Sequence, residues 1–229
     1  MSALLLVRHG QASFGSANYD RLSSLGEEQV GHLRDHFTRI SQKVDAIYSG
    51  SLARQRSTAE ILDGSAGCGL ATLSALDEYD AQSLIERHAA LIGAPLTGLQ
   101  GSAATLDQRN FQRRLEAVGL AWVNGELDHP QLESWSAFRA RVADGLEQIM
   151  AREGRSRDIV VSTSAGVIGA AVAHVLGLDD HRALRLSWVV FNASLTRIRY
   201  DGTRCSLESF NVVSHLETQP EPRRLLTHR

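Results

Sequence analysis

Short apolar runs alternate with amphipathic stretches along the chain. Leu4 to Val7, Ala46 to Tyr48 and Ile159 to Val161 are unbroken apolar runs, typical of buried strands. Between them, apolar residues recur at helical spacing, first over 24–40, with Ser24 as the expected cap, and again after Ser134. Strands that alternate with helices predict an α/β three-layer sandwich, in which helices cover both faces of a mostly parallel sheet.

The middle of the chain loses this alternation. From Asp77 to about Glu133 we expect helices near 81–92 and 105–123, separated by glycine, proline and threonine. We interpret 77–133 as a helical insertion that packs over the sheet as a cap on the ligand crevice. The insertion belongs to a single domain that spans residues 1–217.

Two late runs, Leu195 to Tyr200 and Leu207 to Val213, have β character and complete the predicted sheet. The residues after Glu217 are rich in polar residues and proline. We therefore expect 218–229 to form a flexible tail.

Composition narrows the classes of partner. The net charge of the 229 residues is −2, so no overall basic field predicts binding to nucleic acid or to an anionic membrane. No apolar run approaches the roughly 20 residues that span a bilayer. The two cysteines, Cys68 and Cys205, form no C-x-x-C motif, which fits a reducing compartment. We expect a cytoplasmic protein.

Three loops follow predicted strands, and open α/β sheets bind ligands beyond the carboxyl ends of their strands. They are Arg8-His9-Gly10, Ser49-Gly50-Ser51 and the stretch from Ser162 to Gly166; Arg54 follows the second by one helical turn. Small residues let backbone amides approach an anion, and the arginine fork matches two phosphate oxygens. The pattern predicts a local binding site for phosphate or another oxyanion.

The same segments resemble a known family. The run from Leu4 to Gly10 resembles the strand and Arg-His-Gly signature of the histidine phosphatase superfamily, the phosphoglycerate mutase-like proteins. Further blocks resemble this family in the order in which it has them: Leu22 to Gly26 with Gln29, Ser49 to Arg54 with Thr58 to Glu60, Leu76 to Tyr79, Asn192 to Thr196, and Asn211 to Leu216. The resemblance covers nearly the whole chain to about Leu216.

The resemblance implies covalent phosphoryl transfer without metal or organic cofactor. His9 would be the nucleophile and form a phosphohistidine that water hydrolyses. Arg8 and Arg54 would bind the phosphate oxygens, and Ser13 would contact phosphate from the following loop. Glu78 would protonate the leaving oxygen and later activate water.

The carboxylates beside Glu78 leave its assignment open. Asp77 and Asp80 are close enough in sequence for either to be the acid instead. The substrate expected from the resemblance is a small phosphomonoester.

One position departs from the family pattern. Where the family has a second histidine, this chain has Ser164, which can donate a hydrogen bond to phosphate but carries no charge. The departure leaves three options: a slower phosphatase, a phosphatase rescued by another histidine such as His215, or a phospholigand-binding protein without catalysis. The function expected first is a metal-independent phosphomonoesterase, the binding protein is the alternative, and a phosphoglycerate mutase ranks lower.

Overall fold

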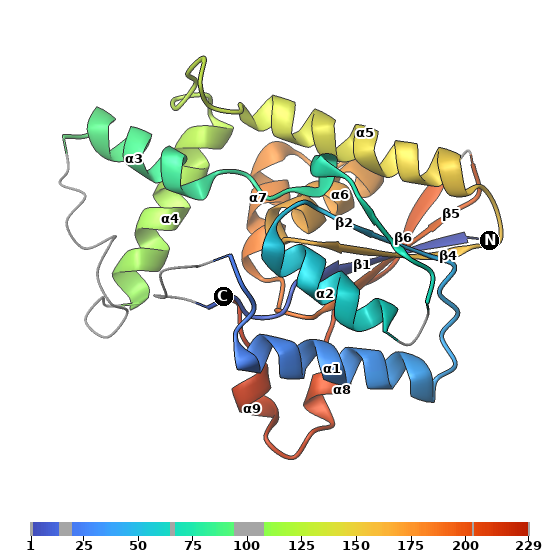
Figure 1. Cartoon of the computed structure of the whole chain (residues 1–229). Coiled ribbons are helices and arrows are strands. Elements are labelled where there is room, and N and C mark those ends of the chain that lie inside the picture. Colours follow the sequence, from blue (N-terminus) through green and yellow to red (C-terminus); the bar gives the residue numbers. More distant parts are fainter. Residues whose placement is uncertain (1, 14–19, 65–66, 94–107, 203, 229) are drawn as a thin grey trace.

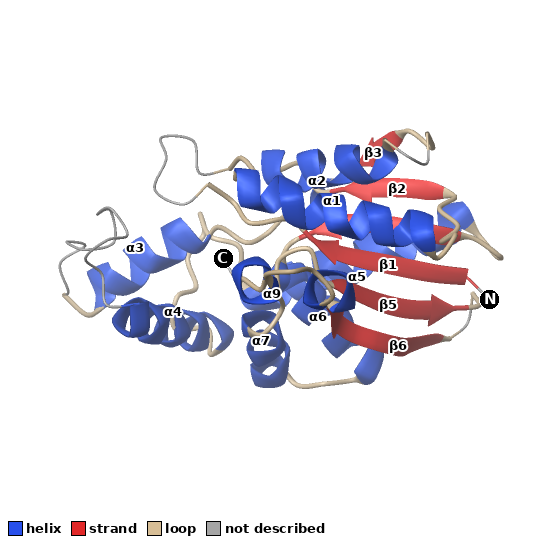
Figure 2. Cartoon of the chain, turned by 90° about the horizontal axis from the view of Figure 1, so that it is seen from below, coloured by secondary structure: helices blue, strands red, loops and turns tan. Residues whose placement is uncertain are grey.

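The computed structural model describes residues 2–13, 20–64, 67–93, 108–202 and 204–228 (Figure 1). Its centre is a six-stranded sheet with the order β3-β2-β4-β1-β5-β6 (Figure 2). In that order, the strands are Leu70–Thr72, Ala46–Ser49, Asp158–Thr163, Ser2–Arg8, Leu195–Tyr200 and Cys205–Val212. The first four run parallel, and β5 and β6 add an antiparallel edge. The mostly parallel sheet that the sequence predicts is confirmed.

Helices cover both faces of this sheet (Figure 1). The covering helices are α1 (Ser24–Arg39), α2 (Ala53–Asp63), α5 (Trp135–Glu153) and α6 (Ala165–Leu176), and α7 (Asp180–Trp188) packs against α6. Alternate residues of β1 serve opposite layers: Leu5 packs in one apolar cluster with Val30 and Leu33 of α1, whereas Leu4 packs in the other with Phe138 of α5. This alternation, with every β1 residue buried, confirms the three-layer sandwich.

The insertion contributes two helices, α3 (Ala81–Leu91) and α4 (Gln108–Val123), which agree closely with the predicted segments. Both lie beyond the carboxyl ends of the parallel strands (Figures 1 and 2). Their anchor is aromatic: Trp122, 1% exposed, lies 4.7 Å from Tyr79 and 5.5 Å from Phe138 between ring centroids. Residues 94–107 of the predicted insertion lie outside the described residues.

Two local predictions need correction. The cap of α1 is Ser23 rather than Ser24, because the Ser23 side chain accepts a hydrogen bond from the Gly26 amide. The segment expected to be a flexible tail is packed against the domain as far as His228, through α8 (Ser214–Glu217) and α9 (Pro222–Leu225). Leu225, 1% exposed, anchors it in an apolar cluster that Leu226 joins, and two apolar residues among polar ones give too weak a sequence signal to reveal such an anchor.

Within the described part of the chain, no helix combines the length and the apolar character needed to cross a bilayer.

Candidate active site

The parallel strands bring the three predicted loops to one edge of the sheet. His9 directly follows β1, and its amide donates to the carbonyl of Thr163, the last residue of β4, at 2.8 Å. Gly50 directly follows β2, and its amide donates to the Ser162 carbonyl at 3.2 Å. Helices α2 and α6 begin just beyond these loops. The convergence that the strand pattern predicts is therefore present.

The ring of His9 is buried, with 5% of the residue exposed, and each ring nitrogen has a partner. Nδ1 lies 2.7 Å from the carbonyl oxygen of Gly10. A carbonyl can only accept, so Nδ1 carries the proton. Nε2 then has the lone pair, and it accepts from Nε of Arg54 at 3.2 Å. This tautomer gives Nε2 the lone pair that the predicted role of His9 as a nucleophile requires.

The surroundings keep this imidazole neutral. Burial lowers the pKa of His9 well below its usual 6.5, and the positive charges of Arg54 and Arg8 lower it further. The hydrogen bond to the Gly10 carbonyl opposes these effects and is the smallest of the four. The unprotonated, nucleophilic form is therefore populated at neutral pH.

Arg54 connects His9 to a carboxylate that sequence reasoning missed. Its side chain is 12% exposed, and Nη1 donates to Oδ1 of Asp20 at 2.6 Å. Oδ2 of Asp20 accepts from the Ala53 amide in the first turn of α2 at 2.8 Å. Asp20 thus ties the guanidinium to a helix N-terminus, where a negative charge is favoured. Its only sequence signal is that no other acidic residue lies between His9 and Glu27.

Arg8, 8% exposed, is held by backbone carbonyls. Nη2 donates to the carbonyl of His228 at 2.8 Å, and Nη1 donates to that of Val190. Both acceptors come from late segments of the chain, far from Arg8 in sequence. Their uncharged oxygens fix the plane of the guanidinium without neutralising it.

Glu78 faces the N-terminus of α6. Its Oε2 accepts from the Gly166 amide at 3.0 Å, and Oε1 accepts from the Tyr79 amide at 3.3 Å. Burial raises the pKa of Glu78 above its usual 4.5, against the two amides and the charges of Arg54 and Arg8. Because both arginines act on this carboxyl group, Glu78 shares their electrostatic environment. Gly166 makes room for it: a Cβ there would meet Oε1 at 2.2 Å.

The neighbouring carboxylates have structural partners. Asp77 accepts from both the amide and the hydroxyl of Ser51, ahead of α2. Asp80 is the N-cap of α3 and accepts from the Ser83 amide at 3.1 Å. Of the three candidates for the acid, Glu78 is thus the one that the geometry favours.

Ser164, 1% exposed, is the N-cap residue of α6, but its side chain makes no capping hydrogen bond. Its Oγ instead accepts from Nε2 of Gln55 at 2.9 Å, and the same amide donates to the Leu76 carbonyl at 3.0 Å. Accepting from Gln55 leaves the hydroxyl hydrogen of Ser164 for a donor role. Its phosphate contact stays a prediction.

The remaining two candidates lie differently. Ser13 donates through Oγ to the Leu22 carbonyl at 3.0 Å, inside the loop that follows His9. Its phosphate contact also stays a prediction.

His215 lies on α8 and is buried, with 2% of the residue exposed. The centroid of its ring is 6.0 Å from that of His36 of α1. Burial lowers the pKa of His215 to about 4, so it offers no imidazolium at neutral pH to replace the missing histidine.

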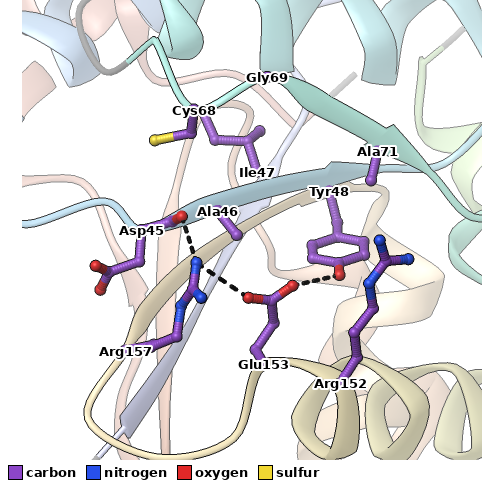
Figure 3. A pocket seen from close by; sticks show the side chains of 10 residues that line it. All are labelled: Asp45, Ala46, Ile47, Tyr48, Cys68, Gly69, Ala71, Arg152, Glu153 and Arg157. Atoms are coloured by element: carbon purple, nitrogen blue, oxygen red, sulfur yellow. Dashed lines mark hydrogen bonds and ion pairs between the residues drawn. The ribbon is translucent and has the colours of Figure 1, made fainter.

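A pocket of about 370 Å³ lies at the opposite, amino-terminal end of β2 (Figure 3). Part of its polar lining is paired: Arg157 donates to the Asp45 carbonyl at 2.7 Å and forms an ion pair with Glu153 at 3.2 Å. Glu153 accepts from the Tyr48 hydroxyl at 2.6 Å. These contacts tie the end of α5 to β2, and none of the candidate site residues lines this pocket.

The family model described as the histidine phosphatase superfamily (branch 1) matches residues 4–94 and 100–213. The chain belongs to this superfamily. Phosphatase or mutase-like phosphoryl transfer is therefore the chemistry of its family.

Relatives and solved structures agree with this membership. The chain is 27% identical over 230 residues to the "Probable phosphoglycerate mutase GpmB" of Shigella boydii serotype 18, covering 95% of this chain and 96% of the relative. It is similar in fold to YhfR of Bacillus stearothermophilus, with a TM-score of 0.68, 17% identity and coverage of 94% and 99% of the two chains. Phosphoserine phosphatase of Entamoeba histolytica, in complex with phosphoserine, gives a TM-score of 0.63 at 18% identity, covering 94% and 100%.

Asp20→Asn tests whether the Asp20 carboxylate competes with anions for Arg54. The amide keeps an acceptor for Nη1 but removes the negative charge, so orthophosphate should bind more tightly. Because the pair is partly solvated, we expect a gain of up to about fivefold, measured by calorimetry. Asp35→Asn, which breaks an exposed ion pair on α1, is the matched control and should change nothing. Equal or weaker phosphate binding by Asp20→Asn would refute the competition.

Proposed function

We propose that this protein is a phosphomonoester hydrolase that works through a phosphohistidine on His9 and needs no metal ion. The observation that carries the proposal is the state of the His9 ring. Its proton is fixed on Nδ1 by the Gly10 carbonyl, and its pKa is lowered, so Nε2 offers a lone pair at neutral pH.

In the first step, Nε2 attacks phosphorus and the bond between phosphorus and the ester oxygen breaks. For Nε2 of His9 to attack phosphorus, Nε of Arg54, which now donates to it at 3.2 Å, must donate to a phosphate oxygen instead. Arg8 and Arg54 stabilise the charge spread over the equatorial oxygens. Asp20, Val190 and His228 hold the two guanidinium groups in place, which lowers the cost of reorganisation.

Glu78 supplies the proton that the leaving oxygen needs. Its raised pKa increases the protonated fraction above that of an ordinary glutamate. In the second step Glu78, now ionised, takes a proton from water as the water attacks the phosphohistidine. Orthophosphate leaves, and both His9 and Glu78 return to their starting states.

Phosphoglycerate mutase is the second candidate, because the matched Shigella boydii relative carries that name. The two activities share the phosphohistidine and differ in which acceptor, water or a substrate hydroxyl, receives the phosphoryl group. Ser164 bears on the rate in either case, since a neutral donor stabilises transition-state charge less than an imidazolium would.

The proposal is tested by turnover of a panel of phosphomonoesters in the presence of EDTA, including phosphoserine and 3-phosphoglycerate. We expect orthophosphate release by the wild type and a loss of at least about 1,000-fold in His9→Ala, because the attacking atom is removed. Isomerisation of 3-phosphoglycerate without net phosphate release would favour the mutase. A requirement for divalent metal, or wild-type rates in His9→Ala, would contradict the proposal.

Glu78→Gln tests the acid. Poor leaving groups such as alkoxides need a proton in the transition state, so alkyl phosphates should lose about 100-fold or more in turnover, whereas activated aryl phosphates lose little. The raised pKa of Glu78 also predicts the alkaline limb of kcat/KM, since activity falls as the acid ionises. Glu78→Gln should abolish that limb. Asp80→Asn, which alters only a helix cap, is the control; equal losses on alkyl and aryl substrates in Glu78→Gln would remove Glu78 from this role.

A further inference from the structure

The backbone of the nucleophile is held by a turn from a distant part of the chain. The Ala193 amide lies 3.0 Å from the Arg8 carbonyl and 3.3 Å from the His9 carbonyl, and the Arg8 amide donates to the Ser194 carbonyl at 3.2 Å. Ala193 is fully buried and has a φ of 53°, a left-handed conformation that is uncommon for a residue with a Cβ. Such a conformation persists only where its surroundings over-determine it.

One peptide plane decides the tautomer of His9. The Gly10 carbonyl accepts from Nδ1 of His9, and the N–H on the other side of the same peptide, that of Gln11, donates to Oε1 of Gln29 at 2.9 Å. The Gln29 side chain therefore binds the N–H of the same peptide whose carbonyl accepts the His9 proton. Gln29 is fully buried, so a misdirected amide would leave polar groups unsatisfied.

The preceding peptide is held in the same way by a second buried amide. The His9 carbonyl accepts from Nδ2 of Asn192 at 3.1 Å, and the Gly10 N–H donates to Oγ1 of Thr58 at 3.2 Å. Asn192 is also fully buried. The orientation of the two consecutive peptides after His9 thus depends on which end of the Gln29 and Asn192 side-chain amides faces each peptide.

Thr227 contacts both amides through one hydroxyl. Its Oγ1 donates to Oδ1 of Asn192 at 3.0 Å and accepts from Nε2 of Gln29 at 2.8 Å. The backbone carbonyl of Thr227 also accepts from the backbone N–H of Asn192 at 2.8 Å. The backbone partners determine which end of each amide faces which way: the His9 carbonyl takes the nitrogen end of Asn192, and the Leu225 carbonyl takes the nitrogen end of Gln29 at 2.7 Å. The Thr227 hydroxyl then links the two amides in these orientations, donating to the oxygen of Asn192 and accepting from the nitrogen of Gln29.

We propose that Thr227 is a positioning residue for His9: its hydroxyl bridges Asn192 and Gln29 and holds both amides in place, and these amides hold the two peptide planes that follow the nucleophile and fix its tautomer. As far as turnover is concerned, the inference rests on the proposed function. The Leu225 anchor holds the segment in place, and the end of the chain lies near the edge where β1 ends (Figure 1).

Three variants separate this role from general stability. Thr227→Val is close in shape but lacks the hydroxyl, Thr227→Ser restores it, and Thr218→Val removes an exposed threonine hydroxyl from the same segment, where it bonds only the Ser214 carbonyl. Each is compared with wild type by thermal unfolding, by KM and by the rate of phosphoenzyme formation. The ligand-free proteins are also compared by ¹⁵N NMR of the His9 ring.

We expect Thr227→Val to slow phosphoenzyme formation by roughly 10-fold or more with KM changed less than about twofold, because the loss falls on orientation of the nucleophile. Its His9 ring should change from a single Nδ1–H tautomer to a mixture. Thr227→Ser and Thr218→Val should match the wild type in both readouts.

Wild-type rate and tautomer in a folded Thr227→Val would overturn the proposal, as would a Thr227→Ser variant as impaired as Thr227→Val. A rate loss explained entirely by the unfolded fraction would also overturn it. If the wild type itself turns over no phosphomonoester, the proposed function fails, and the NMR comparison alone decides the role of Thr227.

Discussion

The hydrogen bond from Nδ1 of His9 to the Gly10 carbonyl determines what the rest of the site can do. A buried imidazole has two possible tautomers, and only the one protonated on Nδ1 leaves Nε2 free to attack phosphorus. The bond is 2.7 Å long and its acceptor belongs to the backbone, so it does not depend on the rotamer of a second side chain. The turn at Ala193 and the buried side-chain amides of Asn192 and Gln29 hold the backbone that supplies this acceptor.

Burial and the nearby charges shift the pKa values of His9 and Glu78 in opposite directions, and each shift favours the protonation state that the proposed mechanism needs. Burial and the two arginines lower the pKa of His9, which keeps the nucleophile unprotonated. The same arginines also lower the pKa of Glu78, but burial outweighs them and raises it. An unprotonated imidazole together with a carboxyl group of raised pKa is the combination that the proposed phosphoryl transfer to His9 and the departure of an alkoxide require. Asp20 moderates the field by pairing with Arg54.

Local sequence patterns were sufficient for five of the six strands, for the layered architecture and for the edge at which the chemistry gathers, whereas β3 and α7 were not predicted. Apolar runs fix the strands, parallel order brings Arg8-His9-Gly10, Ser49-Gly50-Ser51 and Ser162 to Gly166 together, and motif order indicates the family. The contacts of single polar residues were not predictable in this way. Asp20 binds Arg54 and Asp77 binds the loop before α2, and nothing in the residues around either aspartate indicates its partner. Thr227 was expected in a flexible tail because its partners, Asn192 and Gln29, are brought to it only by tertiary packing.

The central claim is that a phosphoryl group passes through His9. The most direct measurement is a rapid-quench experiment in EDTA, in which substrate labelled in the phosphoryl group is mixed with enzyme and stopped with base, and the labelled peptide is identified. The account predicts a burst approaching one phosphoryl group per molecule, stable to base, labile to acid and attached to His9. Turnover without a phosphoenzyme, or with the label on another residue, would contradict it.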